Sequence, residues 1–263
     1  MLRLKAAGPM EQFEILPIVK LDFGGLDISL TNSSLWMLIG LAAILIFFFS
    51  ATRRVSIIPG RLQSMAEVLY SFIFDLVRDT IGPEGRKFFP YVFSLFIFIF
   101  VLNLFGMIPS IPGTPAEIHT FTPTSHLIVT LALAMLTITI VVIYGFWKNG
   151  LGFLRLFAPS GQPLPMYLIL VPVEIISFLS RPLSLAIRLF ANMFAGHIIL
   201  KVFAGFVVSL IGAGGGWFLL GLAPFLGVTA VTMLEFLVAG LQAYVFAILT
   251  CIYLSDAAHA SDH

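Results

Sequence analysis

The chain has 263 residues, of which 10% are charged and 59% are hydrophobic before its 22 glycines are counted. Soluble domains carry about 25% charged residues, and a folded chain of about 300 residues still exposes about a quarter of its unfolded surface. A soluble fold is therefore excluded, and we predict an all-α polytopic membrane protein. The net charge of +1 gives no electrostatic footprint for nucleic acid, and the single cysteine excludes an internal disulfide framework and a Cys-based metal cluster.

The first membrane span is predicted at 33–50, after an N-terminal segment of 32 residues. This stretch carries no charge over 18 residues, and Arg53 and Arg54 follow it. At 1.5 Å per residue it is long enough to cross a hydrocarbon core of about 30 Å. Two further spans are predicted at 88–108 and 126–147.

The segment 61–81 has a different pattern from the spans on either side of it. Its apolar residues share one helical face: Leu62, Met65, Leu69, Phe72 and Leu76. Its polar residues share the other: Glu67, Ser71, Asp75, Arg78 and Asp79. This pattern predicts an amphipathic helix that lies at the membrane interface and does not cross it.

Basic residues predict the orientation of the chain. Segment 51–87 contains six of them, 148–164 contains two and 109–125 contains none. The positive-inside rule then places 51–87 and 148–164 in the cytoplasm and the N-terminus outside.

Two long apolar stretches, 165–211 and 217–254, flank the glycine-rich turn 212–216. As continuous helices they would be roughly 70 and 57 Å long, about twice a membrane thickness. Either each helix breaks or both lie steeply tilted. Pro172 and Pro182 allow kinks without forcing a break, because partners in a membrane bundle can satisfy the freed carbonyls.

These two stretches carry polar side chains at helical spacing. One face of the first holds Glu174, Ser177, Arg181, Ser184, Arg188, Asn192 and Gly196. The second holds a sparser set: Thr232, Glu235, Gln242, Thr250 and Tyr253. A charge at the centre of a membrane helix costs about 2.5–3.5 kcal/mol even on the lenient insertion scale. We therefore expect these side chains to face protein or water.

An antiparallel hairpin about the glycine turn pairs His197 with Glu235 and Arg188 with Gln242. With the orientation above, His197 and Glu235 lie between Arg188 and the outside, while Glu174 and Ser177 lie between Arg188 and the cytoplasm. A guanidinium is effectively never deprotonated, so a proton cannot pass through it. The arrangement predicts two proton paths separated by a permanent cation.

Four segments resemble subunit a of F-type ATP synthases: 103–109 (NLFGMIP), 129–134 (VTLALA), 179–200 (LSRPLSLAIRLFANMFAGHIIL) and 241–254 (LQAYVFAILTCIYL). The core RLFANMFAG is highly specific to this family. Having histidine at 197 and glutamate at 235 is similar to the alphaproteobacterial and mitochondrial branch. The resemblance implies that the two long helices are strongly tilted and pack along a rotating c-ring.

The resemblance also implies residue roles. Arg188 matches the arginine that meets the c-ring carboxylate, and the inner half-channel positions match Glu174 and Ser177. The outer half-channel positions match Asn103, Asn192, His197, Glu235 and Gln242. The implied partners are the c-ring, peripheral-stalk b-type subunits and membrane lipids of a bacterial inner membrane. The resemblance further implies that the subunit needs no cofactor or metal. It would catalyse no covalent chemistry itself, because ATP is made and hydrolysed in soluble subunits.

Two other functions are compatible with a polytopic chain. A stand-alone secondary ion transporter would favour internal inverted repeats, and we find none. A purely structural membrane anchor would use Arg188 only to tie helices together, and would use His197 and Glu235 as a static pair. Arg181 and Lys201 could extend toward lipid headgroups in any of these cases.

Overall fold

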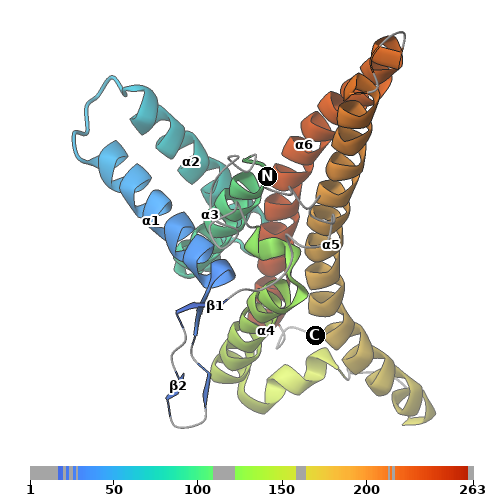
Figure 1. Ribbon diagram of the computed structural model, residues 1–263. Helices are drawn as coiled ribbons and strands as arrows, with labels where there is room; N and C mark the ends of the chain where they lie inside the picture. The colour runs from blue at the N-terminus through green and yellow to red at the C-terminus, as the bar shows by residue number, and fades with distance from the viewer. Residues whose placement is uncertain are drawn as a thin grey trace. The chain divides into compact units, whose positions relative to one another are not determined.

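Figure 1 shows a computed structural model of the chain, which describes residues 17–19, 22–23, 26–27, 29–108, 122–157, 164–212, 214 and 217–259. Among these residues are six α-helices: α1 (Asn32–Thr52), α2 (Arg61–Ile81), α3 (Phe89–Gly106), α4 (Leu127–Asn149), α5 (Leu164–Gly212) and α6 (Trp217–Ala258). Short 3-10 helices adjoin them: η2 (Pro83–Lys87), η4 (Pro123–Ser125) and η5 (Gly150–Leu156). Five helices, all except α2, are long and apolar enough to cross a membrane. The predicted all-α polytopic fold is confirmed.

The N-terminal segment contains short strands that the sequence analysis did not predict. Strand β1 (Pro17–Val19) pairs antiparallel with β4 (Leu30–Thr31), and β2 (Asp22–Phe23) pairs antiparallel with β3 (Leu26–Asp27). Runs of two or three residues are too short to display the apolar–polar alternation by which strands are recognised in a sequence.

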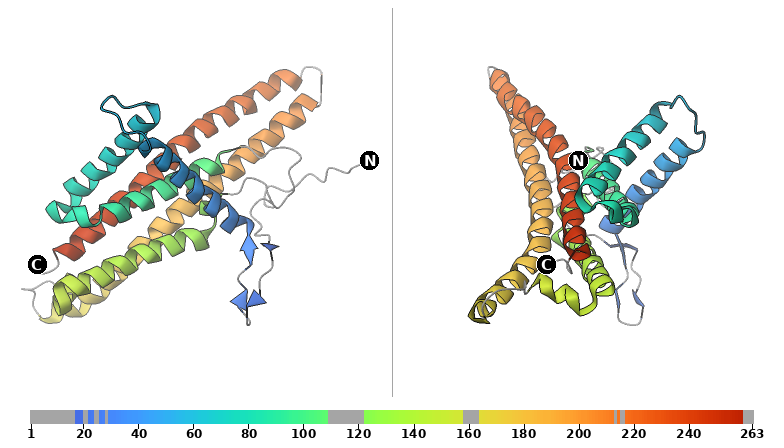
Figure 2. Two further views of the ribbon diagram at one scale, coloured as in Figure 1. Left: turned by 90° about the vertical axis from the view of Figure 1, so that its left-hand side faces the viewer. Right: turned by 180° about the vertical axis from the view of Figure 1, so that it is seen from behind.

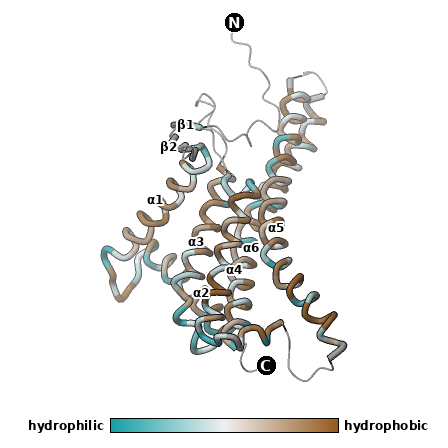
Figure 3. Tube along the Cα trace, turned by 90° about the horizontal axis from the view of Figure 1, so that it is seen from below, coloured by the Kyte–Doolittle hydropathy of each residue, from teal (hydrophilic) through white to brown (hydrophobic). Residues whose placement is uncertain are grey.

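Helix α1 begins at a reciprocal cap. The backbone N–H of Thr31 donates to Ser34 Oγ at 2.8 Å, and the backbone N–H of Ser34 donates to Thr31 Oγ1 at 3.3 Å. These bonds satisfy backbone donors that a helix start leaves open. Hydrophobic residues then dominate α1 in Figure 3, and few of them are buried, as expected for a helix that lies in lipid.

The chain forms two compact units, and both long helices contribute to each. The first unit comprises Met1–Ala43, Ile99–His126 and Leu189–Gln242. The second comprises Ile44–Phe98, Leu127–Arg188 and Ala243–His263. Helix α5 is continuous over 49 residues and α6 over 42, although Pro172, Pro182 and Pro224 lie inside them. Of the two alternatives above, a break in each helix is therefore wrong.

Within the first unit, the facing parts of α5 and α6 run side by side toward the glycine turn (Figure 2). A methyl group placed on Gly227 would lie 3.3 Å from the ring of Phe203, and one on Gly221 would lie 3.4 Å from Ile211 Cγ1. Positions 203 and 227 therefore face each other, as do 211 and 221. This is the hairpin register that the sequence predicts.

Within the second unit, aromatic side chains join α2 to α3. The rings of Tyr70 and Phe89 lie 4.6 Å apart, and those of Phe72 and Phe96 lie 6.0 Å apart. The side chains that α2 buries are Gln63, Ala66, Ile73, Val77 and Ile81. Leu62 and Met65, on the apolar face expected from sequence, are instead exposed. The described residues thus bury a stripe of α2 that differs from the predicted apolar face, and leave Leu62 and Met65 of that face exposed.

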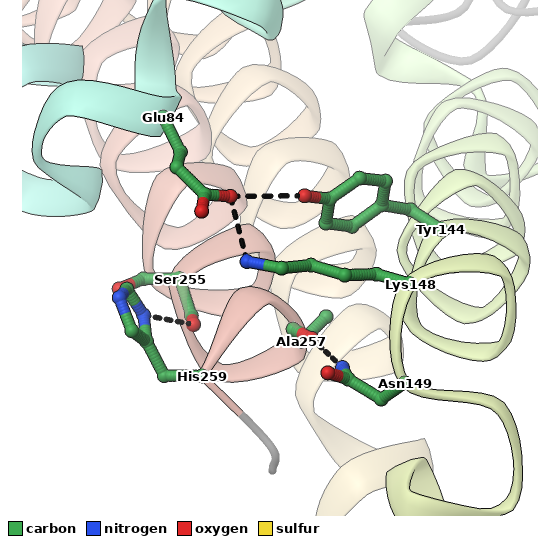
Figure 4. Close-up of polar contacts among 7 residues, drawn as sticks. All are labelled: Glu84, Tyr144, Lys148, Asn149, Ser255, Ala257 and His259. Atoms are coloured by element: carbon green, nitrogen blue, oxygen red, sulfur yellow. Dashed lines mark hydrogen bonds and ion pairs between the residues drawn. The ribbon is translucent and has the colours of Figure 1, made fainter. Parts of the chain in front are cut away.

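A polar cluster in the second unit ties η2, α4 and the end of α6 together (Figure 4). Lys148 Nζ donates to Glu84 Oε2 at 2.7 Å, and the Tyr144 hydroxyl donates to the same oxygen at 3.3 Å. The Asn149 amide donates to the backbone carbonyl of Ala257 at 2.7 Å. The bond from Lys148 lowers the pKa of Glu84 from its ordinary value of 4.5.

We expect Glu84→Gln to lower the melting temperature of the detergent-solubilised protein at pH 7, because Lys148 loses its anionic partner. Since the pKa of Glu84 is lower in the folded state, its stabilisation is complete above the ordinary pKa of 4.5 and is lost as the pH falls through the lowered value. The difference in melting temperature should therefore shrink below pH 4.5.

The matched control is Asp79→Asn, because Asp79 pairs only with its neighbour Arg78 and its side chain is 70% exposed. We expect this control to leave the melting temperature almost unchanged at both pH values. Equal melting temperatures for Glu84→Gln and the unmodified protein at pH 7 would contradict the role of the ion pair.

Candidate functional site

The polar face of α5 exposes Arg188 and, one helical turn later, Asn192. Both lie within a helix long and apolar enough to span a membrane. In the second unit, to which Arg188 belongs, no described carboxylate lies within ion-pairing distance of its guanidinium. A guanidinium in this position is costly against lipid. It therefore needs water or a partner that the described part of its own unit does not supply.

His197, further along α5, is hydrogen-bonded to a residue that the sequence analysis did not single out. Its Nε2 lies 2.9 Å from the hydroxyl of Thr122, which immediately precedes η4. In the described residues, no ion pair or hydrogen bond joins His197 to Glu235. In the predicted facing pair, the imidazole is thus hydrogen-bonded to the residue before η4 and not to Glu235.

Glu235 of α6 is 7% exposed and lies against the backbone of Gly196 on α5. A Cβ atom added at Gly196 would collide with Glu235 Oε1, so the carboxyl group occupies the space that a larger residue would fill. Neither carboxyl oxygen has a hydrogen-bond partner among the described protein groups. A buried carboxyl in this state needs water, a proton or a cation.

Two buried amides accompany Glu235 in the first unit. Asn103 of α3 is fully buried, and its Nδ2 donates to the backbone carbonyl of Ala239 at 3.1 Å. Gln242 of α6 is also buried. The side-chain oxygens of both amides lack a donor among the described residues. The interior of this unit thus offers several acceptors that its own chain leaves unsatisfied.

Glu174 and Ser177 belong to the second unit and are half-buried. The Glu174 carboxylate lies 3.8 Å from Arg181, which also lies 3.5 Å from Asp256 near the end of α6. The Arg181 guanidinium sits 5.9 Å from the ring centre of Tyr253. Arg181 is therefore shared between two carboxylates and an aromatic ring.

The structure thus brings together Glu235 with Gly196, Asn103 with α6, and Glu174 with Arg181. The predicted pairing of Arg188 with Gln242 stays a prediction, because the two residues belong to different units. The sequence did not reveal that Thr122 and Asp256 contact the polar face of α5. Thr122 is a neutral loop residue with no periodic signal, and Asp256 lies beyond 254, where the sequence placed the end of the last span.

The described groups suit proton exchange. Carboxyl, imidazole and hydroxyl groups can each take up or release a proton or relay one through a hydrogen bond. Among the residues that the structure describes, no three His, Cys, Asp or Glu side chains are grouped to hold a metal ion.

Comparison with known sequences assigns the chain to a family. The family model described as "ATP synthase A chain" matches residues 34–255. A protein of Hyphomonas neptunium named ATP synthase subunit a is 56% identical over 258 residues, covering 98% of both chains. Proteins of the same name from Maricaulis maris and Mesorhizobium japonicum are 54% and 52% identical, covering 95% and 96% of this chain and 97% of their own lengths. The chain therefore belongs to the ATP synthase subunit a family, in its alphaproteobacterial branch.

Proposed function

We propose that this chain is the stator-side proton channel of a rotary ATP synthase, with two offset half-channels that meet a c-ring at Arg188. The observation that carries the proposal is the exposure of Arg188 on a membrane-spanning helix, with no carboxylate partner among the described residues of its own unit. A carboxylate on a neighbouring, moving subunit would supply that partner. The exposed flank of α5 around Arg188 is the surface for such a ring.

The outer half-channel is proposed to run along Asn103, Asn192, His197, Glu235 and Gln242. The unsatisfied oxygens of Asn103, Glu235 and Gln242 support this path, because buried acceptors without protein donors favour water. Glu235 and His197 supply the groups that can take up and release protons.

The inner half-channel is proposed to pass Glu174 and Ser177. The N-terminus then lies outside and the C-terminus in the cytoplasm of a bacterial inner membrane. Both long helices exceed a membrane thickness, at roughly 74 and 63 Å for 49 and 42 residues, so we propose that they are strongly tilted. Peripheral-stalk b-type subunits and lipids would cover the exposed apolar residues of α2.

The proposed mechanism separates uptake from release. A proton enters from outside past His197 and Glu235 and neutralises a c-ring carboxyl, which then moves away from Arg188 into the apolar membrane. After a rotation of the ring, the carboxyl reaches the inner path and loses its proton past Ser177 and Glu174. Arg188 favours this loss, because a carboxylate about 4 Å away gains about 4 kcal/mol at an effective dielectric constant of about 20, before desolvation is subtracted. The guanidinium has no acceptor site, so a proton cannot pass through it.

We expect Arg188→Ala to abolish proton-driven ATP synthesis in inverted membrane vesicles while the complex still assembles. The reason is that nothing would then hold the ring carboxylate in its ionised form between the two paths. The measurement is the rate of ATP synthesis per assembled complex, with Arg155→Ala as control because Arg155 is an exposed cation on η5. Normal synthesis by Arg188→Ala would refute the proposed role, and a purely structural anchor predicts that result.

We expect Gly196→Ala to reduce the rate of proton-driven ATP synthesis by about tenfold or more. The added methyl group would displace the Glu235 carboxyl, and a displacement of about 1 Å can cost roughly 100-fold in rate. The matched control is Gly205→Ala on the same helix, where an added Cβ meets nothing within 4 Å. Equal rates for the two variants would remove Glu235 from the proposed path.

A further inference from the structure

Thr122 occupies a well-defined position in the first unit. It is 6% exposed, and its backbone carbonyl accepts from the Ser125 backbone N–H at 3.0 Å and from the Ser125 hydroxyl at 2.7 Å. These bonds close the turn that forms η4. The Thr122 hydroxyl reaches His197 Nε2 at 2.9 Å across a separation of 75 residues. The contact therefore joins the loop before α4 to the polar face of α5.

A second element fixes the Thr122 side chain. Gly106, the last residue of α3, lies so close that an added Cβ would collide with Thr122 Oγ1 and Cγ2. Glycine at this position therefore permits the close approach of α3 and the loop. The side chain of Thr122 is held between the end of α3 and the His197 ring.

The hydroxyl suits a histidine that changes its protonation state. It can accept a hydrogen bond from a protonated Nε2 and can donate one to a bare Nε2. A bond at Nε2 also orients the ring, and the hydroxyl can keep this bond in both protonation states. Among the residues that the structure describes, the charged groups around this ring are Lys201, which acts on it from the next turn of α5, and Glu235 of α6 beside Gly196. The turn 122–125 contributes only neutral residues, and His126 follows it.

We propose that Thr122 is a positioning residue of the outer half-channel, whose hydroxyl orients the His197 ring and accepts a hydrogen bond from Nε2–H when the ring is charged. The inference rests on the proposed function, because it takes His197 to be part of the proton path. It adds the residue before η4 to that path, beside α3, α5 and α6.

The test uses the complete ATP synthase in liposomes, with Thr122→Val and Thr122→Ser. Valine preserves the shape packed against Gly106 and removes the hydroxyl, while serine retains the hydroxyl. Proton-driven ATP synthesis is measured as the outer pH is varied at fixed inner pH and membrane potential. We expect Thr122→Val to need about tenfold more outer protons for its half-maximal rate, the effect of one hydrogen bond to a charged group. Thr122→Ser should stay within about twofold of the unmodified enzyme.

The matched control is Thr130→Val, because Thr130 is also buried and, among the described residues, its hydroxyl donates only to the Leu127 carbonyl. This control should leave the outer pH profile unchanged. A Thr122→Val profile with an unshifted midpoint would overturn the inference, even if the maximal rate falls, because a merely structural role would lower the rate alone. An equal shift in Thr122→Ser would also overturn it. If the valine complex does not assemble, Thr122→Ala is compared with Thr122→Ser in the same way.

His197→Ala separates this inference from the proposed function. If His197→Ala leaves the outer pH profile unchanged, the proposed outer path through His197 is wrong, whatever Thr122 does. If His197→Ala alters the profile and Thr122→Val does not, the path stands and the positioning role of Thr122 is wrong.

Discussion

A polar side chain inside a membrane-spanning helix must be covered by something other than hydrocarbon, and this constraint explains most of the arrangement of α5 and α6. Glu235 meets the constraint within its own chain, because Gly196 lets the two helices approach until the carboxyl group is buried. Asn103 meets it by donating to the α6 backbone. Arg188 does not meet it among the described residues of its own unit, and for that reason the proposed function depends on a second subunit.

The division of the chain into two units also divides the site. The first unit holds the residues of the proposed outer path, whereas Arg188 and the proposed inner residues Glu174 and Ser177 belong to the second. The boundary on α5 falls directly after Arg188, and the boundary on α6 falls directly after Gln242. Each proposed path therefore draws its residues from a single unit.

The spanning helices and the polar face of α5 could be predicted from the sequence, because a membrane requires long apolar helices and makes every charge inside them costly. Apolar length alone gives the five spanning helices, and the cost of intramembrane charge makes the polar stripe from Glu174 to Asn192 conspicuous. The hairpin register followed from one glycine turn and two polar matches. The continuity of α5 through Pro172 and Pro182 could not be decided, since a proline permits a helix in a bundle and also permits a kink.

The contacts that sequence reasoning missed depend on tertiary approach. Thr122 is an uncharged residue outside any periodic segment, and only the end of α3 and the ring of His197 give it a role. The buried residues of α2 were missed because apolar side chains lie on more than one side of this helix, and the sequence does not show which of them the rest of the chain covers. The short N-terminal strands carry too few residues for any pattern.

The absence of a side chain at position 196 has a consequence for the volume between α5 and α6. In this chain the Glu235 carboxyl occupies the space that a side chain at 196 would take, so any larger residue there would have to turn the carboxyl aside or move the two helices apart. The glycine therefore governs both the spacing of the helix pair and the place of the acidic group.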